Sequence, residues 1–420
     1  MRLLVGIARW DLIGGSERYA GAAVRGLAAR GHELVVLCAG GRQEAPAERV
    51  VLPELGQHGL DRAARERLRA ALRAFEPDVI LLLNCPNPDA LELLLDQAPV
   101  VRFVQDHTLF CPGLNKLHAG GGPCTTPLGG GCITRYFLGG GCAGYRTRGR
   151  LPSVRFALRR LRQRLRDIDL HRRAARLIVS SAYMRGELLA AGFAAGAIDV
   201  LPYFTLSATA AIPSGPLPGQ TRAFVEADGR PLLFTPARLA LPDKGVDHLL
   251  AALGRIDGRR FKAVVAGDGP AREWLERKAR DEGLAPAVHF AGWLEPGAIE
   301  TLYAHSRALV LPSVWDEPFG LVGLEAMAHG KPAVAFDVGG VREWLVPGHT
   351  GLTAPRADSE ALARAIVRLL DSPSLARRLG HAGRARLARH FSPALHLERL
   401  ERCLSSARRP ATLAGPARRA

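Results

Sequence analysis

The sequence has 420 residues, of which 47% are hydrophobic and 23% charged, a composition typical of folded globular domains. A chain of this length predicts two or three domains. The net charge of +17 suggests an anionic partner, but 52 of the 57 cationic residues are arginine, a bias that genomic base composition can also produce. Aromatic residues make up only 6% and form no RNA-binding pattern, so we expect no nucleic-acid partner.

The N-terminus and the cysteines bear on location. Only six apolar or glycine residues lie between Arg2 and Arg9, too few for a signal peptide or a membrane span. The seven cysteines, an odd number, fit a reducing compartment better than a disulfide framework. We therefore expect a cytoplasmic protein, with a peripheral position on the cytoplasmic face of a membrane as the alternative.

The first half of the chain alternates strand and helix patterns. An apolar run at 3–8 precedes a loop ending in Gly14 and Gly15, and an Ala-rich helix follows at 17–29. The later apolar runs are continuous, as in parallel strands covered on both faces. Strands are expected at 33–38, 79–83, 100–104 and 177–180.

The Pro-, Gly- and Ser-rich stretch 206–230 predicts a linker. The alternation then restarts, with strands expected at 231–235, 261–266, 288–290, 308–311 and 333–336, and helices at 246–254, 270–283, 297–306 and 320–329. This pattern predicts an α/β fold with two Rossmann-like, doubly wound domains facing a central cleft. The expected domains are 1–205 and 231–390, and 391–420 is expected to return to the first domain as a helix followed by a basic tail.

Two glutamates, Glu317 and Glu325, lie in the apolar, small-residue stretch W-D-E-P-F-G-L-V-G-L-E. Pro318 excludes Glu317 from a helix and favours a helix that starts at Pro318 or Phe319. Glu325 then lies about 10–12 Å further along the helix axis, and the free amides of residues 319–322 lie between the two carboxylates. This order suits a nucleotide sugar, which has hydroxyls at both ends and a diphosphate between them. The alternative is that Glu325 is an ordinary half-exposed helix residue.

Two cations lie upstream in F-T-P-A-R-L-A-L-P-D-K-G. Arg238 follows an expected strand and Lys244 precedes an expected helix, so both should lie at the ligand-binding end of the second domain. They could neutralise a diphosphate and stabilise it as a leaving group. The alternative is that they form surface salt bridges.

These segments resemble glycosyltransferase family 4. The resemblance is most specific over 232–390, through R-L-x₄-K-G, V-A-G-D-G-P, F-A-G-W, E-x₇-E and D-V-G-G-V-R-E-W-L-V-P-G-H-T-G-L. The first half matches more loosely, through G-G-S-E at 14–17 and Q-D-H-T-L-F-C-P at 105–112. The family has the two-domain architecture called GT-B, so 1–205 would be the acceptor domain and 231–390 the nucleotide-sugar donor domain.

The resemblance implies roles for individual residues. Arg238 and Lys244 would hold the donor diphosphate, Glu317 the hydroxyls of the donor sugar, and Glu325 the ribose hydroxyls. Further donor contacts would come from Gly14, Gly15, Gly267, Gly269, Trp293, Leu294, Phe319, Gly320, Leu321 and Val322. The family implies no catalytic metal.

One position departs from the family pattern. Many relatives have a histidine where this chain has Gln105, and His107 lies two residues later in the same loop. Either His107 takes the catalytic place near the donor sugar, or Gln105 supplies a neutral hydrogen bond and His107 has another role.

Two stretches of the expected acceptor domain raise separate hypotheses. In the Cys- and Gly-rich loop 111–145, a structural zinc site formed by Cys111, Cys124, Cys132 and Cys142 is one alternative, free thiols are a second and disulfides a third. The Arg-rich helix expected at 150–176 carries apolar residues at helical spacing: Val154, Leu158, Leu161, Leu165 and Ile168. That helix would lie on an anionic membrane or pack on its own domain with a solvated arginine face.

The resemblance implies a retaining glycosyltransferase, a hexosyltransferase that moves a sugar from a nucleoside-diphosphate donor to a saccharide or lipid-linked acceptor in cell-surface glycan assembly. Two alternatives are a sugar-nucleotide epimerase of the same architecture and a non-catalytic protein that binds nucleotide sugars or an anionic glycan. The motifs do not specify the base, the sugar, the acceptor or the linkage.

Overall fold

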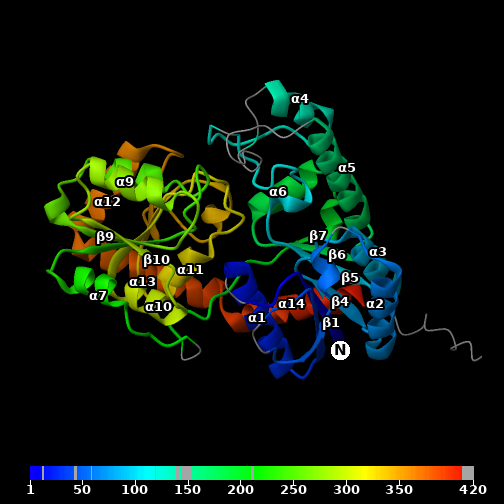
Figure 1. Cartoon of the computed structure of the whole chain (residues 1–420). Helices are drawn as coiled ribbons and strands as arrows, with labels where there is room; N and C mark the ends of the chain where they lie inside the picture. Colours follow the sequence, from blue (N-terminus) through cyan, green and yellow to red (C-terminus); the bar gives the residue numbers. More distant parts are fainter. Residues whose placement is uncertain are drawn as a thin grey trace, which may run out of the picture. The chain divides into compact units, whose positions relative to one another are not determined.

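The computed structural model describes residues 1–11, 14–41, 45–57, 59–118, 120–138, 142, 154–209 and 212–408. The chain forms two compact units (Figure 1). Unit 1 contains Met1–Pro112, Val154–Pro202 and the segment that begins at Pro393; unit 2 contains Gly113–Ser153 and Tyr203–Ser392.

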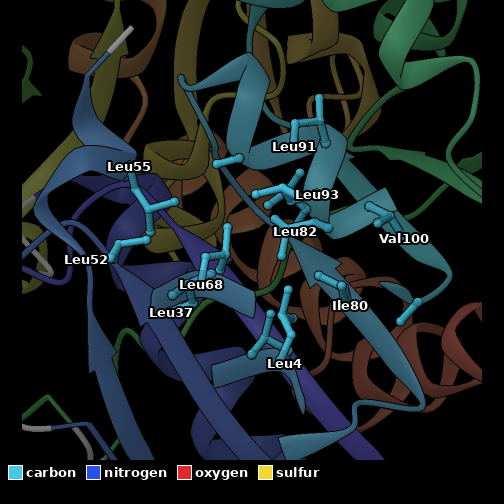
Figure 2. Packing of buried hydrophobic residues seen from close by; sticks show 14 of the residues in the cluster. Leu4, Leu37, Leu52, Leu55, Leu68, Ile80, Leu82, Leu91, Leu93 and Val100 are labelled. Atoms are coloured by element: carbon cyan, nitrogen blue, oxygen red, sulfur yellow. The ribbon is translucent and has the colours of Figure 1, made fainter. Parts of the chain in front are cut away.

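Unit 1 is built on a parallel sheet with the strand order β3-β2-β1-β4-β5-β6-β7. Its strands are β1 (Arg2–Ile7), β2 (Glu33–Cys38), β3 (Glu48–Val51), β4 (Val79–Leu82), β5 (Val100–Val104), β6 (Arg176–Val179) and β7 (Ile198–Val200). Its helices are α1 (Gly15–Ala29), α2 (Arg62–Phe75), α3 (Pro88–Gln97), α5 (Val154–His171), α6 (Ala182–Ala190) and α14 (Pro393–Ala407). Figure 2 shows one apolar layer of this unit, where Leu68 of α2 and Leu91 of α3 join strand residues such as Leu4 and Ile80 in a buried cluster.

Unit 2 is built on a second parallel sheet with the order β10-β9-β8-β11-β12-β13. Its strands are β8 (Leu232–Pro236), β9 (Lys262–Ala266), β10 (Val288–Gly292), β11 (Ser306–Leu311), β12 (Ala333–Phe336) and β13 (Gly351–Ala354). Its helices are α4 (Gly130–Leu138), α7 (Gly219–Glu226), α8 (Val246–Leu253), α9 (Arg272–Asp281), α10 (Pro296–His305), α11 (Leu321–Ala328), α12 (Ser359–Asp371) and α13 (Pro373–His390).

The strands expected from continuous apolar runs are all present, within one or two residues at their ends. The pattern missed β3, β7 and β13, which all lie at sheet edges; β3 also has mostly exposed side chains. An edge strand is covered on fewer sides, so it needs no long apolar run.

The expected linker at 206–230 contains helix α7, which the sequence did not predict. Phe224 of α7 stacks on His289 of β10 with ring centroids 5.2 Å apart, and the hydroxyl of Thr221 hydrogen-bonds His289 Nε2 at 3.0 Å. These contacts attach the helix to the sheet, and the whole stretch from Tyr203 clusters with unit 2.

The last described segment of the chain, which begins at Pro393, belongs to unit 1. Helix α14 packs against α1, β4 and β5 (Figure 1). Of the helices in the described residues, none has a stretch long and apolar enough to cross a bilayer.

Candidate active site

The candidate residues of unit 2 come from loops at the carboxyl ends of its central strands. The strand order of the sheet reverses direction between β8 and β11, which are neighbours although they are far apart in sequence. The loop after β8 carries Lys244 and the loop after β11 carries Glu317. Ligands of open parallel sheets bind at such a reversal, where two adjacent loops separate.

Lys244 and Glu317 form a direct ion pair across these two loops. Lys244 Nζ donates to Glu317 Oε1 at 2.6 Å, and only 6% of Glu317 is exposed. The same carboxylate oxygen accepts from the Ser313 hydroxyl at 2.6 Å, and the ammonium lies 4.6 Å from the centre of the Trp315 ring. The two residues that the sequence placed in separate motifs are therefore one charged unit.

The loop that carries Glu317 is fixed by backbone contacts. The Asp243 carbonyl accepts from the amides of Val314 and Trp315, both at 3.1 Å. The Glu317 carbonyl accepts from the Gly340 amide at 2.6 Å, and a Cβ at Gly340 would lie 2.2 Å from the Pro318 oxygen. Only glycine allows this approach, so the D-V-G-G segment supports the site through its backbone.

Asp316, next to Glu317, is held from a third loop. Arg356, which follows β13, donates to the Asp316 carboxylate and to the Val314 carbonyl. Asp316 Oδ1 also accepts from the Gly339 amide at 3.0 Å. These contacts further restrict the loop, and no sequence motif indicated Arg356.

Arg238 is the more accessible of the two predicted phosphate-binding cations. Its side chain is 65% exposed, and Nη2 donates to Asp243 Oδ2 at 3.0 Å. Asp243 is buried and its own carbonyl anchors the Glu317 loop. One residue thus orients both the arginine and the loop.

Helix α11 starts later than the sequence predicted. It begins at Leu321 instead of Pro318 or Phe319, and its N-cap is Gly320 with φ +88°. Phe319 is buried, and its carbonyl accepts from Trp344 Nε1 at 2.7 Å, which holds it outside the helix. The first helical amides are therefore those of Leu321 and Val322, and these carry the helix-dipole charge toward the Glu317 loop.

Glu325 lies in the second turn of α11, as predicted. Its Oε2 accepts from the hydroxyl of Tyr303 at 2.9 Å, and Tyr303 is fully buried. The tyrosine comes from α10 and has no place in the sequence motifs.

The glycines that were predicted to line the nucleotide, Gly267 and Gly269, are also required by close backbone packing. Gly267 has φ +135°, and a Cβ there would lie 2.0 Å from the Ala237 oxygen. Gly269 has φ +157°, and its Cβ would lie 2.4 Å from the Leu239 oxygen. The loops after β8 and β9 therefore touch backbone to backbone. After β10, Trp293 is 58% exposed while Leu294 is buried, so Trp293 is the side chain available to a ligand.

In unit 1, Gly14 is the N-cap and Gly15 the first residue of α1. They follow β1 and lie beside the point where the strand order of that sheet reverses, between β1 and β4.

His107 is fully buried; its Nε2 hydrogen-bonds the Tyr183 hydroxyl at 2.8 Å. Gln105 Nε2 is buried and has no hydrogen-bond partner among the described residues.

The cysteines of the predicted zinc site do not form a ligand set in the part of the chain that the structure describes. No group of three or more His, Cys, Asp or Glu side chains there is arranged to hold a metal ion. Cys111 belongs to unit 1, whereas Cys124, Cys132 and Cys142 belong to unit 2, and Cys124 and Cys132 are free thiols. Burial and the neighbouring Cys124 raise the pKa of Cys132.

The apolar stripe predicted on the Arg-rich helix α5 is buried along one edge and exposed along the other. Leu161 and Ile168 are buried against unit 1, but Val154, Leu158 and Leu165 are 53%, 38% and 43% exposed. The exposed residues recur at i, i+4 and i+11, on one face of the helix. The neighbouring face carries Arg155, Arg159 and Arg162, which are also exposed. The helix therefore packs on its own domain and still presents an apolar strip beside arginines.

Both units match models of known protein families. Residues 13–204 match the model described as Glycosyltransferase Family 4, and residues 220–386 match Glycosyl transferases group 1. The chain is 39% identical over 153 residues to glycogen synthase of Mycobacterium tuberculosis, covering 36% of each chain. It is 30% identical over 242 residues to the GDP-mannose-dependent alpha-(1-6)-phosphatidylinositol monomannoside mannosyltransferase of Mycolicibacterium smegmatis, covering 56% of this chain and 60% of the relative. These matches span about one third to three fifths of the relatives' length.

A solved structure, Anabaena Alr3699/HepE in complex with UDP, superposes with a TM-score of 0.70 at 19% identity, covering 97% of this chain and 100% of that chain. Two parallel α/β units with these strand orders define the GT-B class, which confirms the predicted α/β fold with two Rossmann-like domains. With both models matching in order along the chain, the protein belongs to glycosyltransferase family 4, as its motifs predicted.

Proposed function

We propose that this protein is a retaining glycosyltransferase that transfers a hexosyl group from a nucleoside-diphosphate sugar to a hydroxyl of a saccharide or lipid-linked acceptor. The observation that carries the proposal is the Lys244–Glu317 pair, set beside the N-terminus of α11 with Glu325 one turn further along. We assign the Glu317 carboxylate to sugar hydroxyls, Lys244 and the helix amides to phosphate, and the Glu325 carboxylate to ribose, which is the order of these groups in a nucleotide sugar. The named relatives, which include a glycogen synthase and a mannosyltransferase, support the same reaction class.

In the proposed donor complex, Lys244, the exposed Arg238 and the amides of Leu321 and Val322 bind the diphosphate. Glu317 accepts from hydroxyls of the donor sugar, and Glu325 accepts from the ribose. Trp293, which is 58% exposed, contacts the base.

The chemical step breaks the bond between the anomeric carbon and the diphosphate oxygen. The acceptor hydroxyl forms the new bond on the same face of the sugar, and its proton passes to the departing phosphate oxygen. The negative charge that develops on the diphosphate is stabilised by Lys244, Arg238 and the helix amides, which are fixed before the reaction begins. The loops that carry Lys244 and Glu317 are held by backbone hydrogen bonds to the Asp243 and Glu317 carbonyls. The side chains on them therefore need little reorganisation during the reaction.

We infer that Gln105, and not His107, is the residue of its loop that hydrogen-bonds a sugar. The His107 ring is buried and bonded to Tyr183, whereas Gln105 Nε2 is buried without a hydrogen-bond partner among the described residues. A buried amide without a partner is costly, and a sugar hydroxyl would satisfy it. Gln105→Ala should therefore lower the rate of sugar transfer more than His107→Gln.

We further propose that α5 brings unit 1 to an anionic membrane surface, where a lipid-linked acceptor would lie. The exposed strip Val154–Leu158–Leu165 would enter the headgroup region, and Arg155, Arg159 and Arg162 would contact lipid phosphates. A protein held there would serve cell-surface glycan assembly from the cytoplasmic face.

The test of the function is a donor screen followed by turnover. UDP-, GDP- and ADP-sugars are tested for thermal stabilisation; a ligand at 100 times its dissociation constant should add about 2.7 kcal/mol to stability. The best donor, with the sugar radiolabelled, is then incubated with lipid and saccharide fractions, and release of nucleoside diphosphate should depend on the acceptor.

Three outcomes would contradict the proposal. A changed sugar configuration without any acceptor would indicate an epimerase. Tight donor binding with neither sugar transfer to any fraction nor donor hydrolysis would indicate a non-catalytic binding protein. A transferred sugar with inverted anomeric configuration would exclude the retaining mechanism.

A further inference from the structure

Glu325 is not an isolated carboxylate on α11, because a buried tyrosine from α10 holds it. The Tyr303 hydroxyl lies 2.9 Å from Glu325 Oε2 and 3.2 Å from the Val322 carbonyl. The phenol has one proton, and the shorter distance and the negative charge both favour the carboxylate as its acceptor.

The tyrosine ring is itself immobilised. It stacks on the imidazole of His329, with centroids 5.6 Å apart and planes 14° apart, and it meets Phe234 edge-on at 4.9 Å. His329 Nε2 is bonded to Glu300 Oε2 at 2.7 Å. The hydroxyl therefore has a fixed position relative to α11.

The far end of this network is also anchored. Glu300, which is 1% exposed, accepts from the Ser207 hydroxyl at 2.6 Å and from the Ala208 amide at 2.7 Å. The hydrogen bonds to Ser207, Ala208 and His329 hold the pKa of Glu300 below its usual value even though burial acts to raise it. A charged, fully bonded residue at this end keeps His329, and through it the Tyr303 ring, from shifting.

A purely apolar core would be satisfied by phenylalanine at position 303. A hydroxyl buried there has a cost unless it is bonded, and its charged partner is the carboxylate that the proposed function assigns to ribose. We propose that Tyr303 is a positioning residue for Glu325: it fixes the carboxylate in the orientation that accepts the two neighbouring hydroxyls of ribose, and so sets the preference for ribonucleotide over deoxyribonucleotide donors. This inference rests on the proposed function.

The chemistry of the carboxylate allows both tasks. Two carboxylate oxygens offer about four acceptor positions, and Tyr303 occupies one of them on Oε2. A carboxylate free to rotate would lose side-chain entropy on binding the diol, whereas one already held by Tyr303 has lost it during folding. Removing the hydroxyl should therefore weaken ribose recognition specifically.

The test measures discrimination and not affinity alone. Dissociation constants are determined by calorimetry for UDP, GDP and ADP, and the tightest binder is compared with its 2′-deoxy and 3′-deoxy forms. Wild type should prefer the ribonucleotide at least tenfold. Tyr303→Phe should reduce that ratio at least threefold, Glu325→Gln should reduce it at least as much, and the double variant should match Glu325→Gln alone.

The matched control is Thr235→Val, which removes another buried hydroxyl of unit 2, one that donates to the Val310 carbonyl at 3.0 Å. It should leave the ratio unchanged. Because the ratio compares ligands on one preparation, a partly unfolded variant still gives a valid answer.

The results separate the two proposals. If Tyr303→Phe weakens ribo- and deoxyribonucleotides equally, or leaves the ratio unchanged while Glu325→Gln lowers it, the positioning role is wrong and the proposed function stands. If no nucleoside diphosphate binds, the proposed function itself fails.

Discussion

Lys244 and Glu317 show how one contact can serve both folding and chemistry. Their atoms lie 2.6 Å apart and both side chains are largely buried, at 18% and 8% exposure. Burying two charges is favourable only when each has partners, and here Ser313 and the Trp315 ring supply them. A phosphate that approaches Lys244 meets a cation whose position is already determined.

At the residue scale, Lys244→Ala should lower donor turnover at least a hundredfold, because it removes a preorganised charge from the leaving diphosphate. It should also lower the melting temperature, because Glu317 loses its cation in a buried position. Steady-state release of nucleoside diphosphate and calorimetry measure the two effects.

The control for that substitution is Lys278→Ala. Lys278 pairs with Glu282 on the surface of α9 and is 27% exposed, so its removal should change turnover less than twofold. Turnover of Lys244→Ala within tenfold of wild type would exclude Lys244 from the site.

The start and the packing of helix α11 determine where its side chains lie. Helix α11 begins at Leu321 because Phe319 is engaged with Trp344 and because Gly320 adopts a positive φ. A Cβ at Gly323 would lie 2.3 Å from the Trp344 ring, so the helix packs on that indole directly. The position of Glu325 therefore depends on Trp344, which lies beyond the E-x₇-E motif.

At the element scale, α5 gives a prediction for membrane binding. Leu158→Glu should weaken sedimentation with vesicles containing anionic phosphatidylglycerol at least tenfold, because a carboxylate replaces an apolar side chain in the strip and repels the lipid phosphates. Binding to neutral phosphatidylcholine vesicles should be weak for both proteins, and high salt should release the wild type.

Leu189→Glu is the matched control for α5. Leu189 is 37% exposed on α6 of the same unit and lacks the row of arginines, so its substitution should leave vesicle binding within twofold. Equal loss for both variants, or no binding by the wild type, would reject α5 as the membrane contact.

At the scale of the whole molecule, the last described helix, α14, packs against α1 near the N-terminus of unit 1. Helix α14 brings His396 against Tyr19 of α1: His396 Nδ1 lies 2.7 Å from the Pro202 carbonyl and Nε2 lies 2.8 Å from the Tyr19 hydroxyl. The carbonyl requires a proton on Nδ1, so Nε2 accepts from the tyrosine and the ring is neutral. Burial lowers the pKa of His396 to about 4.

This buried histidine makes stability depend on pH. An unfolded chain takes up the proton near pH 6.5, whereas the folded one excludes it down to about pH 4, so the unfolded state binds more protons in between. Stability should therefore fall as the pH drops through this window, by about 2 kcal/mol between pH 7 and pH 5. His396→Gln should be less stable at pH 7 and should converge with the wild type near pH 5, as measured by urea unfolding; a constant difference across the window would contradict this role.

The sequence alone determined the features encoded by local pattern. Continuous apolar runs predicted the buried parallel strands, Pro318 placed Glu317 in a loop, and motif spacing indicated the family and the donor residues. These signals are local, because propensity and proline geometry act over a few residues.

Only the tertiary structure decided which distant residues meet. The strand order places β8 beside β11, and that adjacency, which no local pattern encodes, joins Lys244 to Glu317. The same holds for Tyr303 against Glu325, for the burial of His107, and for the burial of only one edge of the apolar stripe on α5. Long-range pairing depends on how whole elements pack, and a side chain acquires its partner only after the packing is complete.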